Sequence, residues 1–332
     1  MLKIFLYNDF PHGSCGIQSE NDKNHIESIT LFDIVTDPKV ADIIIFFDYN
    51  GDKRIKKFIN LYLDKFLVLI RTEPPSIIEL QYKIKLPFNL VLDLGKINFV
   101  NGVLLYIEWP ISPIFFEKRI TVPAIDESKV VFVNSNKFGN RNYYYHLRRS
   151  IVYKLNSSVK SFGEGWSIFD FKYRNFIGNL IHNVVRFRIN EILLMNPFVF
   201  NLFSSPKSNI LSKVDLLAYF NYVLVIENDN TYMSEKLIEA LLLDKSVIYI
   251  GGSTSHLPLE IQKNILEPDH SLNRIDLLLK KILVDGSGPT RLSINDNNPS
   301  DNSLLLHSWK ANEVWTKVLK TIIQNYSLFK ST

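Results

Sequence analysis

The sequence predicts an α/β protein made of two successive open sheets. Short runs rich in Val, Ile and Leu recur along the chain, and continuous apolar runs of this length are typical of parallel strands covered on both faces. Segments with helical spacing alternate with these runs, and strand, helix, strand is the unit of an open α/β sheet. The pattern breaks over 112–128. We therefore expect two lobes with a cleft between them.

The first series of elements belongs to the N-terminal lobe. A helix is expected over 51–65, where Ile55, Phe58 and Ile59 fall near helical spacing with lysines opposite. The strands of this lobe are expected at 3–9, 41–49, 66–73, 89–95 and 103–109.

The second series begins with a strand at 129–137 that runs into a polar turn. Residues 213–252 predict helix, strand, loop, helix and strand in that order. The other elements expected are a helix at 142–155, a short strand at 158–166, a polar loop at 285–303, and helices at 269–283 and 311–329. The predicted boundaries are 1–125 for the first lobe, 126–310 for the second, and 311–332 for a C-terminal helix.

Composition narrows the class of protein. The 332 residues contain one cysteine, Cys15, and the start "MLKIFLYNDF" lacks a signal-peptide pattern, so we expect a cytoplasmic protein. No apolar run approaches the roughly 18 residues that a membrane-spanning helix needs. The net charge of +4 is mild and does not indicate nucleic-acid binding. It leaves open a peripheral contact with an anionic membrane surface.

A cluster of polar residues separates two apolar runs in the stretch 220–252. Ser234 is expected to cap a helix that begins with Glu235 and Lys236, and a helix N-terminus at the end of a strand suits a phosphate. Lys236 adds a point charge for a diphosphate, Glu235 can accept from the paired hydroxyls of a ribose, and Asn228 suits a base edge. The alternative interpretation is an ordinary solvated helix start.

Several nucleotide and metal motifs are absent from the sequence. It contains neither a Walker loop nor a GxGxxG turn, and residues 229–231 read Asp-Asn-Thr rather than a DxD motif. HxxxH and CxxC pairs are also absent. We therefore expect neither a metal nor a cofactor.

The stretch 213–252, "KVDLLAYFNYVLVIENDNTYMSEKLIEALLLDKSVIYIGG", resembles the donor-binding signature of the family 10 fucosyltransferases, the α-1,3/1,4-fucosyltransferases. The shared order is a Lys, an apolar strand, Glu-Asn, a short loop, Tyr-x-Ser-Glu-Lys, a helix, and a strand that ends at Gly. The resemblance implies a GT-B architecture of two Rossmann-like lobes with a central cleft. It also implies inverting transfer of fucose from GDP-fucose, with the donor bound mainly in the C-terminal lobe.

The segment 133–155, "VNSNKFGNRNYYYHLRRSIVYKL", is similar to an upstream part of the same family, where an Arg stands seven residues before a helix Leu. Arg148 has that spacing from Leu155, and Arg141 is the competing choice. By the resemblance, Arg148 and Lys236 would neutralise the diphosphate, Tyr232 would hydrogen-bond it, Glu235 would hold the ribose, and Asn228 would lie near the base.

Inverting transfer also needs a base that takes the proton of the acceptor hydroxyl, normally a carboxylate from the opposite lobe. Glu73 stands at the end of a predicted strand of the first lobe, before two prolines, and resembles the family's strand that ends in Gly-Glu. Arg71 and Thr72 replace the small residues expected there. Asp93 and Glu108, also at predicted strand ends, are the alternatives.

The sequence thus predicts a metal-independent, α-1,3-fucosyltransferase-like enzyme whose first lobe binds the acceptor. Its partners would be GDP-fucose as donor substrate and a glycan acceptor such as lipopolysaccharide O-antigen or another surface glycan. A GT-B enzyme using another nucleotide sugar is the nearest alternative. A two-lobed sugar-binding protein is the alternative from a different class.

Overall fold

The computed structural model divides the chain into two compact units. Unit 1 contains Met1–Pro113, Thr231–Met233 and Leu304–Thr332, and unit 2 contains Ile114–Asn230 and Ser234–Ser303. The residues that the structure describes are 2–7, 32–49, 51–72, 80–83, 87–108, 110–111, 130–134, 143–155, 157–163, 213–231, 233–243, 245–268, 271–285 and 310–331.

Unit 1 is built on a parallel sheet with the strand order β2-β1-β3-β4-β5. All five residues of β3 are buried, as the apolar run over 41–49 predicts. The strands predicted at 3–9, 41–49, 66–73 and 89–95 are confirmed. They are β1 (Leu2–Tyr7), β3 (Ile43–Phe47), β4 (Phe66–Arg71) and β5 (Leu90–Asp93), and β2 (Phe32–Ile34) is an additional strand.

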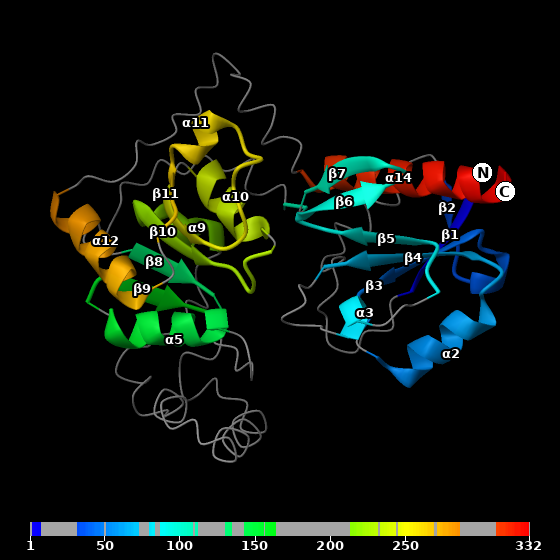
Figure 1. The fold of residues 1–332 in the computed structure, drawn as a ribbon, viewed down its shortest axis with the longest axis horizontal. Helices are drawn as coiled ribbons and strands as arrows, with labels where there is room; N and C mark the ends of the chain where they lie inside the picture. Colours follow the sequence, from blue (N-terminus) through cyan, green and yellow to red (C-terminus); the bar gives the residue numbers. More distant parts are fainter. Residues whose placement is uncertain are drawn as a thin grey trace. The chain divides into compact units, whose positions relative to one another are not determined.

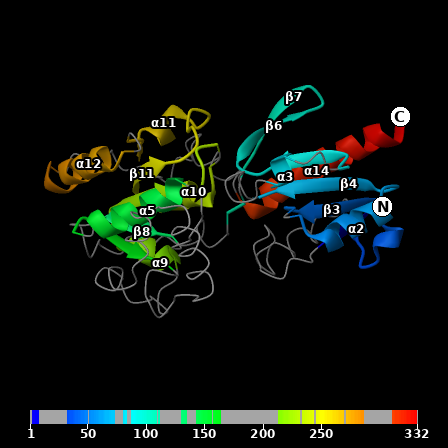
Figure 2. The same cartoon turned by 60° about the horizontal axis from the view of Figure 1, so that its bottom comes forward.

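Helices cover both faces of this sheet (Figures 1 and 2). On one face, Ile55 and Ile59 of α2 (Lys53–Leu61) pack against alternate residues of the central strands. On the other face, α14 (Ala311–Ser331) contributes Trp315, of which 1% is exposed, to the larger apolar cluster. The predicted helices at 51–65 and 311–329 are confirmed. The short elements η1 (Pro38–Val40) and α3 (Leu80–Lys83) complete the described part of the unit.

The prediction that 103–109 forms a strand of this sheet is wrong. That segment is β7 (Val103–Ile107), which pairs antiparallel with β6 (Lys96–Val100) in a separate two-stranded hairpin. The turn between them is Asn101-Gly102, with φ of 50° and 81°. Two consecutive positive φ angles are typical of a type I′ turn, for which Asn-Gly is the strongest sequence signal. The turn closes the hairpin locally, so β7 cannot continue the parallel sheet.

Unit 2 contains a second parallel sheet, with the order β12-β11-β10-β8-β9. The predicted strands near 129–137 and 158–166 and the two in 213–252 are confirmed. The strands are β8 (Val130–Val133), β9 (Val159–Phe162), β10 (Tyr222–Ile226), β11 (Ser246–Ile250) and β12 (Ile265–Leu266).

The helices of unit 2 lie on both faces of its sheet (Figure 1). On one face, α5 (Tyr143–Lys154) and α12 (Leu272–Asp285) pack Ile151 and Ile275 into the main apolar cluster. α10 (Glu235–Leu242) packs on β10 and β11. The remaining described helices are α9 (Lys213–Ala218) and α11 (Leu259–Gln262). Among the helices in the described ranges, none combines the length and the apolar character that crossing a membrane requires.

Candidate functional site

The polar cluster of unit 2 gathers where β8 and β10 end and α10 begins. The carboxyl ends of parallel strands are where open α/β sheets bind their ligands. A small pocket lies at this edge, and Asn134, Lys213 and Lys236 supply its polar lining. The apolar part of the lining comes from Val133, Leu217, Val223, Leu224 and Val225. The starts of α9 and α10 therefore place two lysine side chains in the lining of this pocket.

A fully buried carboxylate, Glu227, lies at the centre of the cluster. It follows the last residue of β10 and has 0% exposure. The backbone amide of Ser234 donates to Glu227 Oε1 at 2.9 Å, and the Ser234 hydroxyl lies 2.9 and 2.7 Å from the two carboxylate oxygens. Burial raises the pKa of Glu227, although the charge of Lys236 opposes this shift. Glu227 thus joins the end of β10 to the start of α10.

Ser234 does not cap α10 as we expected. It occupies the N-cap position, but its side chain makes no capping hydrogen bond. The hydroxyl instead lies against Glu227 and accepts a hydrogen bond from Lys236 Nζ at 3.0 Å. Donation to the buried carboxylate and acceptance from the ammonium group together fix the hydroxyl, so its oxygen does not accept from the first-turn amides as a capping serine would. The side chain of Ser234 therefore leaves the first-turn amides of α10 without a serine cap.

Lys236 connects the acidic side chains of the cluster. Its Nζ lies 3.4 Å from Glu235 Oε1 and 3.9 Å from Glu227 Oε2, and its side chain is 19% exposed. Burial acts to lower the pKa of Lys236, but Glu235 and Glu227 outweigh burial and raise it. The ammonium group consequently stays charged at neutral pH. It is partly shielded from water, and its side chain lines the pocket.

Glu235 is the most accessible acid of this cluster, with 25% of its side chain exposed. Burial acts to raise its pKa, but the charges of Lys236 and Lys213 lower it overall. Its carboxylate is therefore ionised and can only accept hydrogen bonds. Lys213 forms an ion pair with Glu239, whose pKa burial raises.

Arg148 lies buried at the same edge of the sheet, with 2% exposure. Its guanidinium donates to the backbone oxygen of Ile226, and Asn134 Nδ2 donates to the same oxygen at 3.3 Å. The guanidinium also lies 5.1 Å from the ring centroid of Tyr145. Its positive charge acts to lower the pKa of Lys236, which places the two cations within electrostatic reach of each other.

The structure brings together four of the predicted site residues in unit 2. Arg148, Glu235 and Lys236 lie as described above, and Asn228 is buried directly after Glu227. Tyr232, Glu73 and the alternative Arg141 lie outside the residues that the structure describes, and their roles remain predictions.

No role was predicted from the sequence for Glu227, Lys213 or Gly251. A side chain at Gly251 would overlap the Tyr249 hydroxyl and Glu227 Cγ, so the close packing around the buried carboxylate requires glycine. For Glu227 a signal existed, because it is the first polar residue after a fully apolar strand, and that position opens the ligand edge of such a sheet.

The alternative bases in unit 1 are both held in ion pairs. Asp93 Oδ2 lies 2.5 Å from Arg71 Nη2, and the Tyr82 hydroxyl donates to Asp93 Oδ1 at 3.1 Å. Both oxygens of Glu108 accept from Lys317 Nζ, at 3.1 and 2.8 Å. Burial, followed by the charge of Asp93, strongly raises the pKa of Tyr82. Within the described ranges, no three His, Cys, Asp or Glu side chains gather in a way that could hold a metal ion.

Comparisons with known proteins show the fold of this chain. No family model and no curated protein matches its sequence. Among solved structures, Anabaena Alr3699/HepE in complex with UDP and glucose aligns at 10% identity with a TM-score of 0.56, covering 98% of this chain and 100% of that one. The same protein with UDP-glucose aligns at 11% identity with a TM-score of 0.50, covering 100% of both chains.

An α1,3-fucosyltransferase structure is also similar, at 14% identity with a TM-score of 0.49, covering 98% of this chain and 89% of that one. The two Anabaena alignments, together with the two parallel sheets, define the class: an α/β protein of GT-B type with two Rossmann-like lobes.

Proposed function

We propose that this protein is an inverting glycosyltransferase that transfers fucose from GDP-fucose to a hydroxyl of a glycan acceptor. The observation that carries the proposal is the position of Lys236 in the first turn of α10, on the wall of the pocket at the end of β10. A cation beside helix amides, at the ligand edge of a parallel sheet, is suited to a diphosphate.

The remaining residues have complementary roles in this proposal. Lys236 and Arg148 neutralise the diphosphate, and their charge stabilises the leaving GDP as the glycosidic bond to it breaks. Glu235, an ionised acceptor, binds the ribose hydroxyls. Asn228 lies near the base, and Tyr232 hydrogen-bonds the diphosphate.

The proton of the acceptor hydroxyl goes to Glu73 in our proposal. As the hydroxyl oxygen attacks the anomeric carbon from the face opposite the nucleotide, the carboxylate takes its proton and the configuration inverts. Asp93 and Glu108 are poorer candidates, because each carboxylate already accepts from a cation. No metal and no cofactor takes part in the proposed reaction.

The identity of the sugar rests on the resemblance of 213–252 to the family 10 signature. A UDP-sugar is the second candidate donor, because the Anabaena protein with the same fold was solved with UDP-glucose. Phosphate and ribose contacts are common to both nucleotides, so they do not separate the two candidates. For the acceptor we propose a surface glycan such as a lipopolysaccharide O-antigen.

A calorimetric titration with GDP, UDP and CMP tests the class of donor. We expect GDP to bind most tightly and GDP-fucose to be consumed in the presence of a glycan acceptor and EDTA. Tight UDP binding without a response to GDP would contradict GDP-fucose as the donor and would indicate a UDP-sugar instead. Binding of a free sugar with no response to any nucleotide would instead indicate a sugar-binding protein.

The role of Glu73 has its own test. The Glu73→Gln variant should bind GDP like the wild type but lose turnover by about 100-fold or more, since general base catalysis contributes about 10²–10⁴-fold. Unchanged turnover in this variant would show that Glu73 is not the catalytic base.

A further inference from the structure

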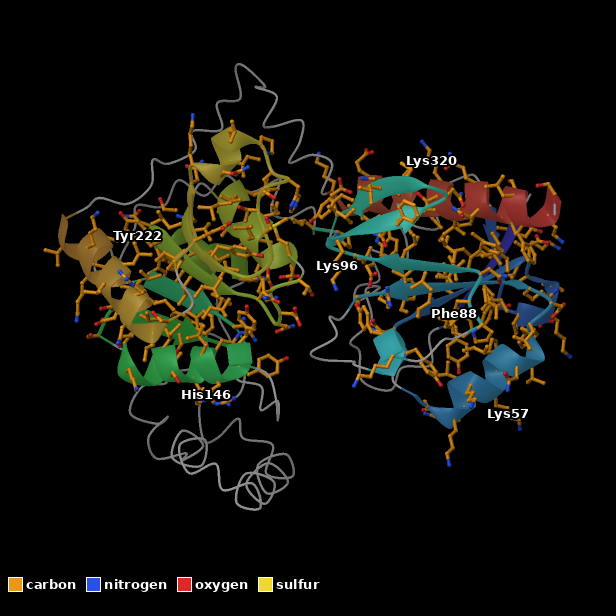
Figure 3. All side chains as sticks on the ribbon, in the orientation of Figure 1. Lys57, Phe88, Lys96, His146, Tyr222 and Lys320 are labelled. Carbon is orange, nitrogen blue, oxygen red and sulfur yellow. The ribbon has the colours of Figure 1, made fainter. Side chains whose placement is uncertain are left out.

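The outer side of α2 in unit 1 carries a concentration of positive charge. Lys53, Arg54, Lys56 and Lys57 are all exposed, whereas Ile55 and Ile59 of the same helix are buried against the sheet. We call these four residues the basic face. Figure 3 shows Lys57 pointing away from the sheet. The helix, "KRIKKFINL", contains no acidic residue.

The basic face lacks the charge balance that is usual on an exposed helix. Lys53 and Lys57 are four residues apart and Lys53 and Lys56 three apart, and like charges at these spacings destabilise a helix. Asp52 caps the helix and pairs with Arg54 at 2.8 Å. Among the described residues, no ion pair includes any of the three lysines. An anionic partner bound to the basic face would relieve this repulsion.

Exposed aliphatic side chains adjoin the basic face. Leu61 is 65% exposed, Leu63 is 55% exposed, and Val40 in η1 is 50% exposed. Lys65 Nζ donates to the backbone oxygen of Lys39 at 3.1 Å, which holds the segment after α2 beside η1. We call Val40, Leu61 and Leu63 the apolar rim. Asp64, whose side chain is 71% exposed, is the acid within this rim.

We propose that the basic face and the apolar rim form a docking surface for an anionic lipid bilayer. Lipid phosphates take the charge of the lysines and arginine, and the acyl region takes the leucine and valine side chains, so that electrostatic attraction and burial of apolar area add. A soluble polyanion would pair with the basic face but would not bury the side chains of the apolar rim. This inference is independent of the proposed function, because none of its residues belongs to the site in unit 2.

Sedimentation of the full chain with lipid vesicles tests the proposal. Vesicles of mixed phosphatidylglycerol and phosphatidylcholine should bind the protein, and pure phosphatidylcholine vesicles should not. Lys53→Gln with Lys57→Gln should lower the partition coefficient roughly thirtyfold, at about fivefold per lysine. Salt at about 1 M should abolish binding, since it shortens the screening length to about 3 Å.

Helix α12 of unit 2 offers matched controls. Lys280→Gln with Lys281→Gln makes the same change in net charge at two exposed lysines and should leave vesicle binding unchanged. Leu61→Asn should weaken binding several-fold, whereas Leu277→Asn, at a position 60% exposed, should not. GDP affinity should stay constant in all four variants, which separates this test from that of the proposed function.

Four outcomes would overturn the docking surface. Three of them concern vesicles: no binding to anionic vesicles, equal binding to neutral ones, and a loss in the α12 controls as large as in the α2 variants. Binding of single-stranded DNA as tight as vesicle binding, with no effect of Leu61→Asn on either, would assign the basic face to a soluble polyanion and also overturn it.

Discussion

The carboxyl edges of the two parallel sheets both carry buried polar side chains, but the surroundings of those side chains differ. At the edge of unit 2, the basic side chains are Arg148, Lys213 and Lys236, and the acidic ones are Glu227, Glu235 and Glu239. Burial raises the pKa of both Glu227 and Glu239, because it disfavours the charged form of each acid. Lys213 and Lys236 also line the pocket at this edge, so two cations adjoin the space open to a ligand.

At the edge of unit 1, the carboxylates are bonded to donors within the protein. Asp93 pairs with Arg71, whose guanidinium lies 4.0 Å from the ring centroid of Tyr82. Asp48, with a positive φ of 51° at the end of β3, accepts from the amide of Thr72 at 2.8 Å and from Gln81 Nε2 at 3.1 Å. These bonds satisfy the carboxylates within the protein.

We expect the two edges to serve two purposes. Where cations line a pocket, the strand ends should attract an anionic ligand, and binding a ligand would then stabilise the folded state. Where the carboxylates are bonded within the protein, the same edge holds loops together. We therefore expect substitutions in unit 2 to change nucleotide affinity and substitutions in unit 1 to change stability.

The largest effect should follow from Lys236→Met. We expect GDP affinity to fall about 10- to 100-fold, because a hydrogen bond to a charged group contributes about 1.5–3 kcal/mol. Isothermal titration calorimetry measures the change, and Lys280→Met, on the exposed side of α12, is the control. An unchanged GDP affinity would contradict the expectation that the edge of unit 2 binds the nucleotide while the edge of unit 1 contributes to stability.

In unit 1, Asp93→Asn should lower the free energy of unfolding by about 2 kcal/mol, since it removes a charged partner of Arg71 and Tyr82. Asp64→Asn breaks a 3.7 Å surface ion pair with Lys65 and should change stability by less than about 0.5 kcal/mol. Urea unfolding measures both. If Asp93→Asn abolished turnover but kept stability, Asp93 rather than Glu73 would be the base.

The alternation of strands and helices could be predicted from the sequence because it depends on local apolar periodicity. β10, α10 and β11 are clear from 213–252 alone, since each has the length and spacing of its element. The error at 103–109 arose because an apolar run has the same appearance in a parallel sheet and in a hairpin. The Asn101-Gly102 turn was the signal that separates them.

The chemistry of the site was only partly predictable. Lys236 and Glu235 follow from position at a helix start, but the hydrogen bonds of Ser234 depend on Glu227, seven residues earlier in the chain. Whether an acid is buried depends on tertiary packing around it, here including the close approach of Gly251. A local rule such as helix capping cannot anticipate that competition.

The raised pKa of Glu227 predicts how pH acts on unit 2. The folded state favours the protonated acid, so this group's contribution to stability falls as pH rises from its ordinary value of 4.5 through the folded-state pKa. Glu227→Gln mimics the protonated form and should flatten that part of the profile in urea unfolding from pH 4 to 9. If the unfolding free energy of the wild type and of Glu227→Gln changed with pH by the same slope, Glu227 would not be the source of this pH dependence.

Glu235 should show the opposite sign, which makes Glu235→Gln the control. Its pKa is lowered, so its contribution is present above its ordinary value of 4.5 and is lost as pH falls through the folded-state pKa. Glu227→Gln should therefore change the pH dependence of stability mainly above pH 4.5. Glu235→Gln should change it mainly below pH 4.5, with the opposite sign.

A smaller effect than that of Asp93→Asn should come from Gly102→Ala in the turn between β6 and β7. Gly102 has a φ of 81°, and no atom lies within 4 Å of an added Cβ, so the cost is backbone strain alone, about 1 kcal/mol. Gly102→Asn, which tolerates a positive φ better, should recover part of that loss in urea unfolding. GDP affinity should be unchanged in both, because the hairpin belongs to unit 1. A loss of GDP affinity without a loss of stability would mean that the hairpin contributes to the nucleotide site, and the division of roles between the two units would fail.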